Sequence, residues 1–397
     1  IGIDGFDWRL TDPLVAAGRM PNLQRLEAAG TRADLLTLVP LEKSPVIWTT
    51  IATGRLPIEG GRGFLVSTGE DGDGPQAYTT WYRTTRAFWN ILTDRNVRVS
   101  VLGWLESWPA EVVNGTMVTD YVKYFAVEGD NNTVSRTYPE ALYDEIRPLV
   151  VFPADVTDAD LAPLVGEPER MGDERAREGI DALRWIRAGD LTFTKLAEHF
   201  LDERPEDVMA VYLRGPDAVC HQFWGDRDLA AAGDDGFPSR QFGPTVDRYF
   251  EATDALLGRI LERIDLAETS VLLVSDHGFQ GPRRGLDGAQ RQGIYMHREL
   301  GTILLAGPWA AGEGLRVEGC RVQDVLPTLL HALELPVGRD LDGEVATALL
   351  GPAGGGERAV EFIPTYEITP LARTAEPPES PVSEEIQERL DALGYVE

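Results

Sequence analysis

The sequence predicts an α/β fold in which a mostly parallel sheet lies between two layers of helices. Short segments rich in Val, Ile and Leu recur at the lengths of buried strands. They are IGI, TRADLLTLVP, NVRVSVLGWL, EDVMAVYLRG, TSVLLVSDHG and GTILLAGP. Segments with apolar residues at helical spacing, such as TVDRYFEATDALLGRILERI, lie between several of them. Strands that alternate with helices are typical of a parallel sheet covered on both faces, a three-layer α/β/α sandwich.

The chain divides into a predicted core, an insertion and a tail. Residues 1–60 and 205–350 carry the strand–helix alternation and form the expected core. Residues 60–205 include one core strand, but their polar and aromatic stretches fit the alternation poorly, so most of this region is expected to be an inserted cap. In the tail, residues 351–397, GPAGGGER predicts a linker and SEEIQERLDALG a last helix that docks on the protein.

The chain is strongly acidic, with a formal net charge of -28 and a pI near 4.5. This charge disfavours a nucleic-acid polymer or an anionic membrane surface as a partner. No run of 18 apolar residues occurs, so no membrane span is predicted. Because the chain opens with a strand already under way, we expect residues upstream of it. A removed leader among them would favour a location outside the cytoplasm.

Acidic and histidine side chains occur where the predicted strands end or begin. These residues are Asp4, Asp217, His221, Asp276, His277 and His297. Asp217 and His221 are four residues apart, which places both on one face of a helix that begins near Asp217. Open α/β sheets build their sites at the carboxyl ends of the strands, so we expect these side chains to meet there. Mixed Asp and His ligands suit zinc or manganese, and their number suggests two ions.

The stretch EKSPVIWTTIATG predicts a helix with Ser44 as N-cap, Pro45 as first helical residue and Gly54 as its stop. The Ser44 oxygen has two possible roles. It could cap its own helix, or it could be a nucleophile, since a bound metal ion can activate a hydroxyl group. The positive end of the helix dipole would also suit a phosphate group.

The order of these motifs resembles the alkaline phosphatase superfamily, and specifically its type I phosphodiesterase/nucleotide pyrophosphatase branch. The matching pieces are IGIDGFDW, SPVIWTTIATGRLP, YLRGPDAVCHQFW, SDHGF and MHRELGTILLAGP. The resemblance covers residues 1–60 and about 205–350. It implies an alkaline phosphatase-like sandwich and a metal-dependent hydrolase of small-molecule phosphate esters.

The resemblance also implies a role for each matched residue. One metal ion would be held by Asp4, Ser44, Asp276 and His277, and the other by Asp217, His221 and His297. Ser44 would attack phosphorus and form a phospho-enzyme, which water then hydrolyses. The ions are expected to be Zn²⁺ in the first place, with Mn²⁺ or iron as alternatives.

Two departures from the family pattern concern the phosphate-binding region. Gly60 stands where relatives often carry His. The residue that holds the phosphate oxygens has no clear counterpart, and Lys43 is a candidate for it, with a solvated lysine as the alternative.

Other functions remain open on the sequence alone. A phosphotransferase or mutase of the same superfamily would move the phosphoryl group to an acceptor other than water. A sulfatase fits less well, because Ser44 is followed directly by Pro45 and Trp48 stands where that group has Arg. A non-catalytic binding protein fits poorly with a full set of ligand positions. Cys220 and Cys320 are expected to be buried free thiols rather than a disulfide.

Overall fold

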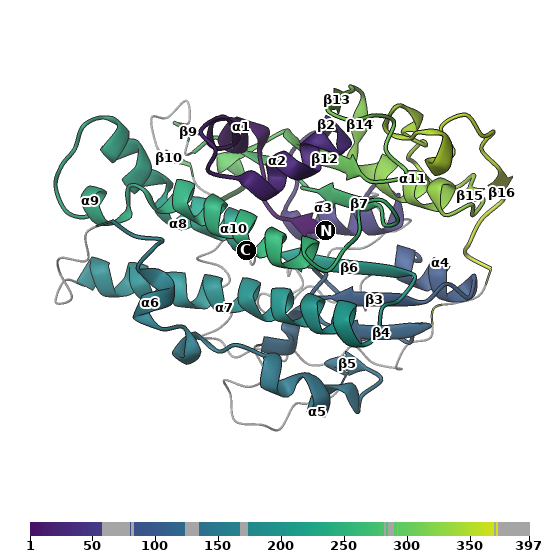
Figure 1. Cartoon of the computed structure of the whole chain (residues 1–397), viewed down its shortest axis with the longest axis horizontal. Coiled ribbons are helices and arrows are strands. Elements are labelled where there is room, and N and C mark those ends of the chain that lie inside the picture. Colours follow the sequence, from purple (N-terminus) through teal and green to yellow (C-terminus); the bar gives the residue numbers. More distant parts are fainter. Residues whose placement is uncertain are drawn as a thin grey trace, which may run out of the picture.

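One large sheet runs through the middle of the molecule, between two layers of helices (Figure 1). The computed structural model describes residues 1–57, 80, 83–123, 135–166, 174–281, 283–284, 290–291, 293–368 and 371. The strand order across the sheet is β13 (Leu315–Arg316), β2 (Gly30–Leu36), β12 (Leu300–Ala306), β7 (Val271–Val274), β1 (Gly2–Ile3), β6 (Val208–Leu213), β3 (Val99–Leu102), β4 (Gly115–Val118) and β5 (Thr137–Tyr138), and β14 (Cys320–Arg321) also pairs with β2.

The central strands are parallel, as the sequence predicts. Strand β1 pairs in parallel with both β7 and β6, and β6 pairs in parallel with β3. Strand β12 is antiparallel to both of its neighbours, β7 and β2. The first residue of β12 therefore lies at the same edge as the last residues of β1, β6 and β7.

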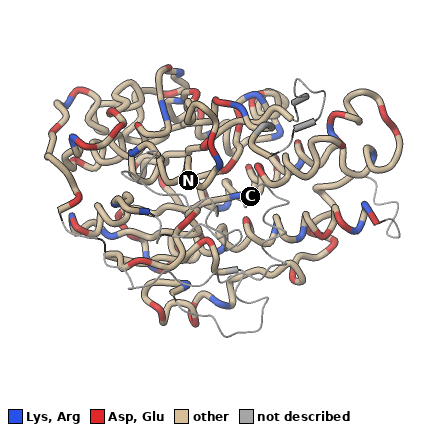
Figure 2. The backbone as a smooth tube through the Cα atoms, turned by 180° about the vertical axis from the view of Figure 1, so that it is seen from behind, with Lys and Arg blue, Asp and Glu red and all other residues tan. Residues whose placement is uncertain are grey.

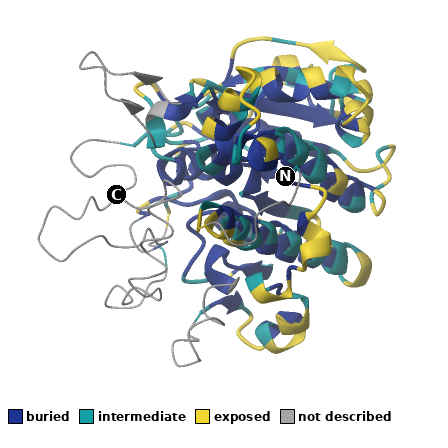
Figure 3. Cartoon of the chain, turned by 90° about the vertical axis from the view of Figure 1, so that its left-hand side faces the viewer, coloured by how far each residue is buried: buried dark blue, intermediate teal, exposed yellow. Residues whose placement is uncertain are grey.

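The alternation of side chains along the strands divides the interior into two faces. On β6, Tyr212 packs with one helix layer, whereas Val211 and Leu213 pack with the other. The first layer contains α3 (Ser44–Thr53), α4 (Phe88–Asp94) and α11 (Val325–Ala332). The second contains α1 (Trp8–Ala16), α2 (Pro21–Ala28), α7 (Glu174–Glu203), α8 (Gly215–Ala231) and α10 (Thr245–Leu261). The expected three-layer α/β/α sandwich is confirmed, and Figure 3 shows the buried sheet with exposed residues on the outer helix surfaces.

Smaller elements complete the described part of the chain. They are α5 (Leu142–Ile146), α6 (Asp158–Leu161), α9 (Ser239–Phe242), β8 (Gly278–Phe279), β9 (Arg283–Arg284), β10 (Gln290–Arg291), β11 (His297–Arg298), β15 (Val337–Gly338) and β16 (Phe362–Ile363). Strand β8 follows the carboxyl end of β7 closely in the chain, and it pairs antiparallel with β11. Both short strands therefore lie close to the sheet edge described above.

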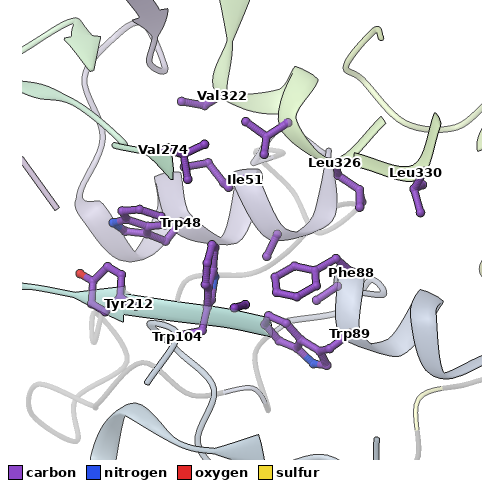
Figure 4. Packing of buried hydrophobic residues seen from close by; sticks show 14 of the residues in the cluster. Trp48, Ile51, Phe88, Trp89, Trp104, Tyr212, Val274, Val322, Leu326 and Leu330 are labelled. Atoms are coloured by element: carbon purple, nitrogen blue, oxygen red, sulfur yellow. The ribbon is translucent and has the colours of Figure 1, made fainter. Parts of the chain in front are cut away.

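Helix α3 is buried along its whole length. All ten of its residues are buried, so it has no face in contact with solvent. Beneath it, the Trp48 ring meets the Trp104 ring edge-on at 5.2 Å between centroids and the Tyr212 ring at 4.9 Å (Figure 4). Gly54 ends the helix at φ 64°, a left-handed conformation that costs glycine little.

The start of α3 differs from the sequence prediction. Ser44 is the first helical residue, and the N-cap position belongs to Lys43, which makes no side-chain capping bond. The prediction of Ser44 as N-cap is therefore wrong. Ser and Pro in sequence suit either the Ncap–N1 or the N1–N2 positions, and the extended backbone of Lys43, at φ -70° and ψ 149°, shows that the second arrangement is present.

Residues 60–205 contribute to the sheet as well as to the surface. Strands β3, β4 and β5 come from this region, and helix α7 packs on α8 and α10. In the tail, β16 pairs with β15, and the Gly355 carbonyl accepts a hydrogen bond from His331 Nε2 at 2.8 Å. Gly60 and the predicted helix SEEIQERLDALG lie outside the described residues. The division into core, cap and tail stays a prediction.

Two further expectations concern the thiols and the membrane. Cys220 and Cys320 are buried free cysteines, as expected. Within the described ranges, none of the helices combines the length and the apolar character needed to cross a bilayer.

Asp190 anchors the helix that follows β6. This buried residue of α7 accepts hydrogen bonds from the backbone N–H groups of Arg214 at 3.1 Å and Gly215 at 3.0 Å, at the start of α8. The Tyr249 hydroxyl of α10 donates to it at 2.9 Å. One carboxylate thus joins three helices and satisfies N–H groups that a helix start leaves without intrahelical partners.

We expect Asp190→Ala to lower the free energy of unfolding by about 2–4 kcal/mol, because it leaves buried donors unsatisfied. Asp190→Asn should cost less, since its amide oxygen can still accept. Urea unfolding followed by circular dichroism measures both. Asp181→Ala on the exposed side of α7 is the control, with an expected change within about 0.5 kcal/mol. Equal effects of Asp190→Ala and Asp181→Ala would contradict the anchoring role.

Candidate metal centre

The candidate ligands gather at one edge of the sheet. Asp4 directly follows β1, Asp276 follows β7 after one residue, and Asp217 lies in the first turn of α8, just after β6. These three strands are adjacent and parallel, so their carboxyl ends meet at this edge. His297 reaches the same edge from the chain just before the antiparallel strand β12.

The first ligand group surrounds the hydroxyl of Ser44. His277 Nε2 lies 3.4 Å from Asp4 Oδ1 and 3.4 Å from Asp276 Oδ2. The Ser44 Oγ lies 3.1 Å from His277 Nε2 and 3.5 Å from Asp4 Oδ1. The three ligands are fully buried and Ser44 is 4 % exposed. The Ser44 side chain therefore faces this group instead of capping α3.

The second ligand group lies against the first. Asp217 Oδ1 is 3.4 Å from His221 Nε2 and 3.5 Å from His297 Nε2, and the two histidine nitrogens are 2.8 Å apart. The rings of His277 and His297 stack with centroids 3.6 Å apart. His277 Nε2 also approaches Asp217 Oδ1 to 3.8 Å. The structure thus brings together the six predicted Asp and His ligands and the Ser44 oxygen, and His277 lies between the two groups.

Lys43 is half-buried and directly precedes Ser44. Its backbone carbonyl accepts from Val46 N at 2.9 Å and Ile47 N at 3.2 Å, which starts the helix. The position next to Ser44 is compatible with a role toward phosphate. That role stays a prediction.

Neighbouring side-chain and backbone groups fix the orientation of two candidate ligands. The Trp48 Nε1–H donates to Asp4 Oδ2 at 3.2 Å, and the Tyr212 hydroxyl donates to the same oxygen. The other oxygen, Oδ1, is then the one directed at Ser44 and His277. His277 Nδ1 donates to the Gly278 carbonyl at 3.1 Å, which leaves the Nε2 lone pair for a metal ion.

Gly5 allows two ligand segments to approach closely. Its φ is +62°, and a Cβ atom there would lie 2.9 Å from the Asp217 Cβ. Its backbone N–H donates to Asp276 Oδ1 at 3.3 Å. A side chain at this position would therefore be strained and would separate Asp4 from Asp217.

Burial and mutual repulsion alter the ionisation of the ligands. Burial raises the pKa of Asp4 and moves that of Asp276 well above its usual range, and neighbouring carboxylates raise both further. Burial also opposes ionisation of Asp217, yet His221 and His297 beside it lower its pKa well below the ordinary value. Burial, together with His277, lowers the pKa of His297 to about 3. His297 is therefore neutral at pH 7, the form that binds metals.

The donor set fits divalent metal ions. Three buried carboxylates share one site, an arrangement that is costly unless cations offset the charge. Within the described part of the chain, Asp276 Oδ2 and His297 Nδ1 are buried and make no hydrogen bond. Two buried groups of three ligands, Asp4–Asp276–His277 and Asp217–His277–His297, have their ligand atoms within 4.8 Å of one another. Mixed carboxylate and imidazole donors suit zinc, manganese or iron.

Glu106 is a buried acidic residue of this region that has no role predicted from the sequence. It follows β3, is 9 % exposed and adopts φ +61°. Its Oε2 accepts from the Thr49 hydroxyl of α3 at 2.9 Å. Burial, reinforced by the charge of Asp120, raises the pKa of Glu106 to about 8. The signal in the sequence was a lone acidic residue in the aromatic stretch GWLESW.

Metal binding should release protons. The raised pKa of Asp276 favours the protonated carboxyl in the metal-free site, and an incoming cation favours the carboxylate and so displaces the proton. Titration of metal-free protein with Zn²⁺ should therefore give a binding enthalpy that depends on the ionisation enthalpy of the buffer, and an apparent affinity that rises with pH. An enthalpy independent of the buffer would contradict this coupling.

The Glu106 carboxyl should make stability depend on pH. Its pKa is about 8 in the folded protein and 4.5 as a model value, so its stabilising contribution is lost as pH rises through 8. Between about pH 5.5 and 8.5 the stability of Glu106→Gln relative to wild type should increase by about 3 kcal/mol. Urea unfolding at both pH values measures this. The matched control is Glu344→Gln, at an exposed glutamate, where we expect no such trend. A constant difference between Glu106→Gln and wild type would refute the assignment.

The chain was compared with solved structures and with curated protein sequences. Among solved structures, one described as Ps i-CgsB in complex with k-i-k-neocarrahexaose is 15% identical, with a TM-score of 0.46 and coverage of 86% of this chain and 73% of that chain. Another, BT4656 in complex with its substrate D-glucosamine-2-N,6-O-disulfate, is 15% identical, with a TM-score of 0.42 and coverage of 86% and 77%. No curated protein sequence matches the chain.

The family comparison covers most of the sequence. The model of the type I phosphodiesterase/nucleotide pyrophosphatase family matches residues 1–325 of the 397-residue chain. The matched part contains all six candidate ligands and Ser44. The chain belongs to the type I phosphodiesterase/nucleotide pyrophosphatase family, a hydrolase family of the alkaline phosphatase superfamily.

Proposed function

We propose that this protein is a metal-dependent phosphoester hydrolase in which Ser44 is the nucleophile. The observation that carries the proposal is the direction of the Ser44 side chain. Its Oγ lies 3.1 Å from His277 Nε2 and 3.5 Å from Asp4 Oδ1, within a ligand group, although a serine at a helix start commonly caps the helix. Membership of a phosphodiesterase family supports the reaction class.

Two metal ions would be held by this chain. Asp4, Ser44, Asp276 and His277 would bind one ion, and Asp217, His221 and His297 the other. Zn²⁺ is the ion that we propose first, with Mn²⁺ or iron as alternatives that the same ligands accept. When bound, such ions lower the pKa of a hydroxyl group and offset the negative charge of a phosphate ester.

The chain itself supplies the nucleophile and its placement. The Ser44 hydroxyl loses its proton to solvent, and Oγ forms a bond to phosphorus while the bond to the ester oxygen breaks. The departing alkoxide takes a proton from solvent. Water then attacks the phosphoserine, the bond between Oγ and phosphorus breaks, and Ser44 recovers its proton. The N-terminus of α3 favours the negative phosphate throughout.

The substrate class proposed is a small-molecule phosphoester. Acidic residues are spread over the backbone trace in Figure 2, with basic residues between them, and the net charge is -28. A polyanion would be repelled by such a protein, whereas a small ester needs favourable charge only at the site itself. A phosphotransferase or mutase of the same superfamily is the alternative. The acceptor, water or an alcohol, distinguishes it.

We expect Ser44→Ala to reduce kcat by at least about 10³-fold, because it removes the atom that bonds to phosphorus. A panel of nucleotide diesters, lipid head-group diesters, monoesters and a sulfate ester, assayed with Zn²⁺ and with a chelator, measures this. Thr50→Val is the matched control, since the Thr50 hydroxyl donates to the Val46 carbonyl of its own helix and, among the described residues, makes no bond to a candidate ligand. It should retain the wild-type rate.

The phosphoserine itself can be detected. Acid quenching during turnover should give wild-type protein that is heavier by one phosphoryl group, located at Ser44 by peptide mass spectrometry. Full activity of Ser44→Ala on every phosphoester would refute the nucleophile. Transfer to an added alcohol in preference to water would favour the phosphotransferase, and hydrolysis of only the sulfate ester would favour a sulfatase.

A further inference from the structure

Asp7 is a buried carboxylate outside the ligand set that contacts three segments of the chain. It is fully buried, and its Oδ2 accepts from the Phe279 backbone N–H at 3.1 Å. The Arg298 guanidinium donates to both of its oxygens, from Nε at 3.0 Å and from Nη2 at 2.9 Å. The Arg9 N–H donates to Oδ1 at 2.8 Å, which caps α1. All four bonds converge on one side chain.

Asp7 and two of its partners, Phe279 and Arg298, are each within three residues of a candidate ligand in the sequence. Asp7 follows Asp4 by three residues and Phe279 follows His277 by two, while Arg298 directly follows His297. The strands β8 and β11 hold the last two segments together, with Phe279 opposite His297. The Asp7 carboxylate therefore connects the segments that carry Asp4, His277 and His297.

The approach of Asp7 depends on a glycine. A Cβ atom at Gly278 would lie 2.5 Å from Asp7 Oδ2 and 2.4 Å from the Leu300 carbonyl, so any larger residue would force the two segments apart. Gly278 also provides the carbonyl to which His277 Nδ1 donates. The same residue thus permits the contact with Asp7 and orients a ligand.

The pair of Asp7 and Arg298 suits a supporting role on chemical grounds. A two-point contact between guanidinium and carboxylate fixes both position and angle, which a single bond does not. The pair is neutral overall, so it adds no charge to a site that already contains three carboxylates. Its four protein donors also leave Asp7 poorly placed to act as a ligand itself.

We propose that Asp7 and Arg298 are positioning residues of the metal centre, which hold His297 at its distance from His277 and Asp4. The proposal rests on the proposed function, because it presupposes bound metal ions. Asp4 and the residues before His277 are also fixed by β1 and β7 in the main sheet, whereas His297 lies in the short strand β11, outside the main sheet. Loss of the Asp7–Arg298 contact should therefore weaken chiefly the ion held by Asp217, His221 and His297.

The test measures Zn²⁺ binding to metal-free protein in competition with a chromophoric chelator, which gives the number of ions and each affinity. Wild type should bind two. Arg298→Met should bind one of them about 10- to 100-fold more weakly, the usual effect of losing a residue that orients a ligand. Arg298→Lys keeps the charge without the two-point contact, so its affinity for that ion should lie between those of wild type and Arg298→Met. Asp7→Asn should resemble Arg298→Met.

Asp254→Asn provides a matched control for general destabilisation. Asp254 is also a buried carboxylate that accepts backbone N–H groups at a helix start, from Asn22 at 3.2 Å and Leu23 at 2.7 Å, but it lies on α10 against α2. Its substitution should reduce the unfolding midpoint and leave both Zn²⁺ affinities unchanged. An equal loss of affinity in Asp254→Asn and Arg298→Met would overturn the proposal.

The remaining outcomes separate this inference from the proposed function. If wild type binds two ions and both Arg298→Met and Arg298→Lys bind them with wild-type affinity, the inference fails and the proposed function stands. If wild type binds none, both fail. Arg298→Lys keeps the test decisive if Asp7→Asn does not fold, because a lysine keeps the charge and most of the side-chain volume.

Discussion

The hydrogen bonds to the Asp4 carboxylate are the constraint on which the rest of the site depends. One of its oxygens accepts from Trp48 on α3 and Tyr212 on β6, so the other is directed at Ser44 and His277. A single side chain thereby joins the helix that begins at Ser44, the first strand and its neighbour. The aromatic packing beneath α3 also holds the Asp4 carboxylate in place, because the Trp48 and Tyr212 rings that donate to it are in contact with each other.

Electrostatics explains why this edge of the sheet is suited to cations. Asp4, Asp217 and Asp276 are buried together, and burial raises the pKa of two of them. In an acidic protein a phosphate ester gains little from the surface as a whole. The attraction must be local, and the ligands concentrate negative charge where metal ions would reverse it. The neutral pair of Asp7 and Arg298 gives mechanical support to the ligands without adding to this charge.

Much of the fold and of the candidate ligand set could be predicted from the sequence, because both follow from local patterns. Apolar runs located the strands, and Asp or His at their ends identified Asp4, Asp276 and His277. The four-residue spacing identified the helix face of Asp217 and His221. The direction of β12 could not be predicted, since a buried strand has the same pattern in either direction. The antiparallel direction is what brings His297 to the same edge.

Contacts between distant segments account for what the sequence did not reveal. Asp7 and Arg298 are 291 residues apart, and an Asp three residues after a ligand looks like an ordinary helix cap. Tyr212 alternates along β6 like any core residue, and its hydroxyl bond to Asp4 depends on which face it occupies. The assignment of Ser44 as N-cap failed because a Ser-Pro pair fits two positions at a helix start, and the sequence does not show that the extended backbone ends at Lys43.

The complete burial of α3 has a consequence for substrate recognition. A helix packed on every side cannot rotate or slide without disturbing close-packed neighbours, and protein interiors resist such shifts. The Ser44 oxygen, which we propose as the nucleophile, is therefore a fixed point in the molecule. Differently shaped phosphoesters have to be brought to it in one orientation, so the selection among them falls to the segments around the helix and not to the helix itself.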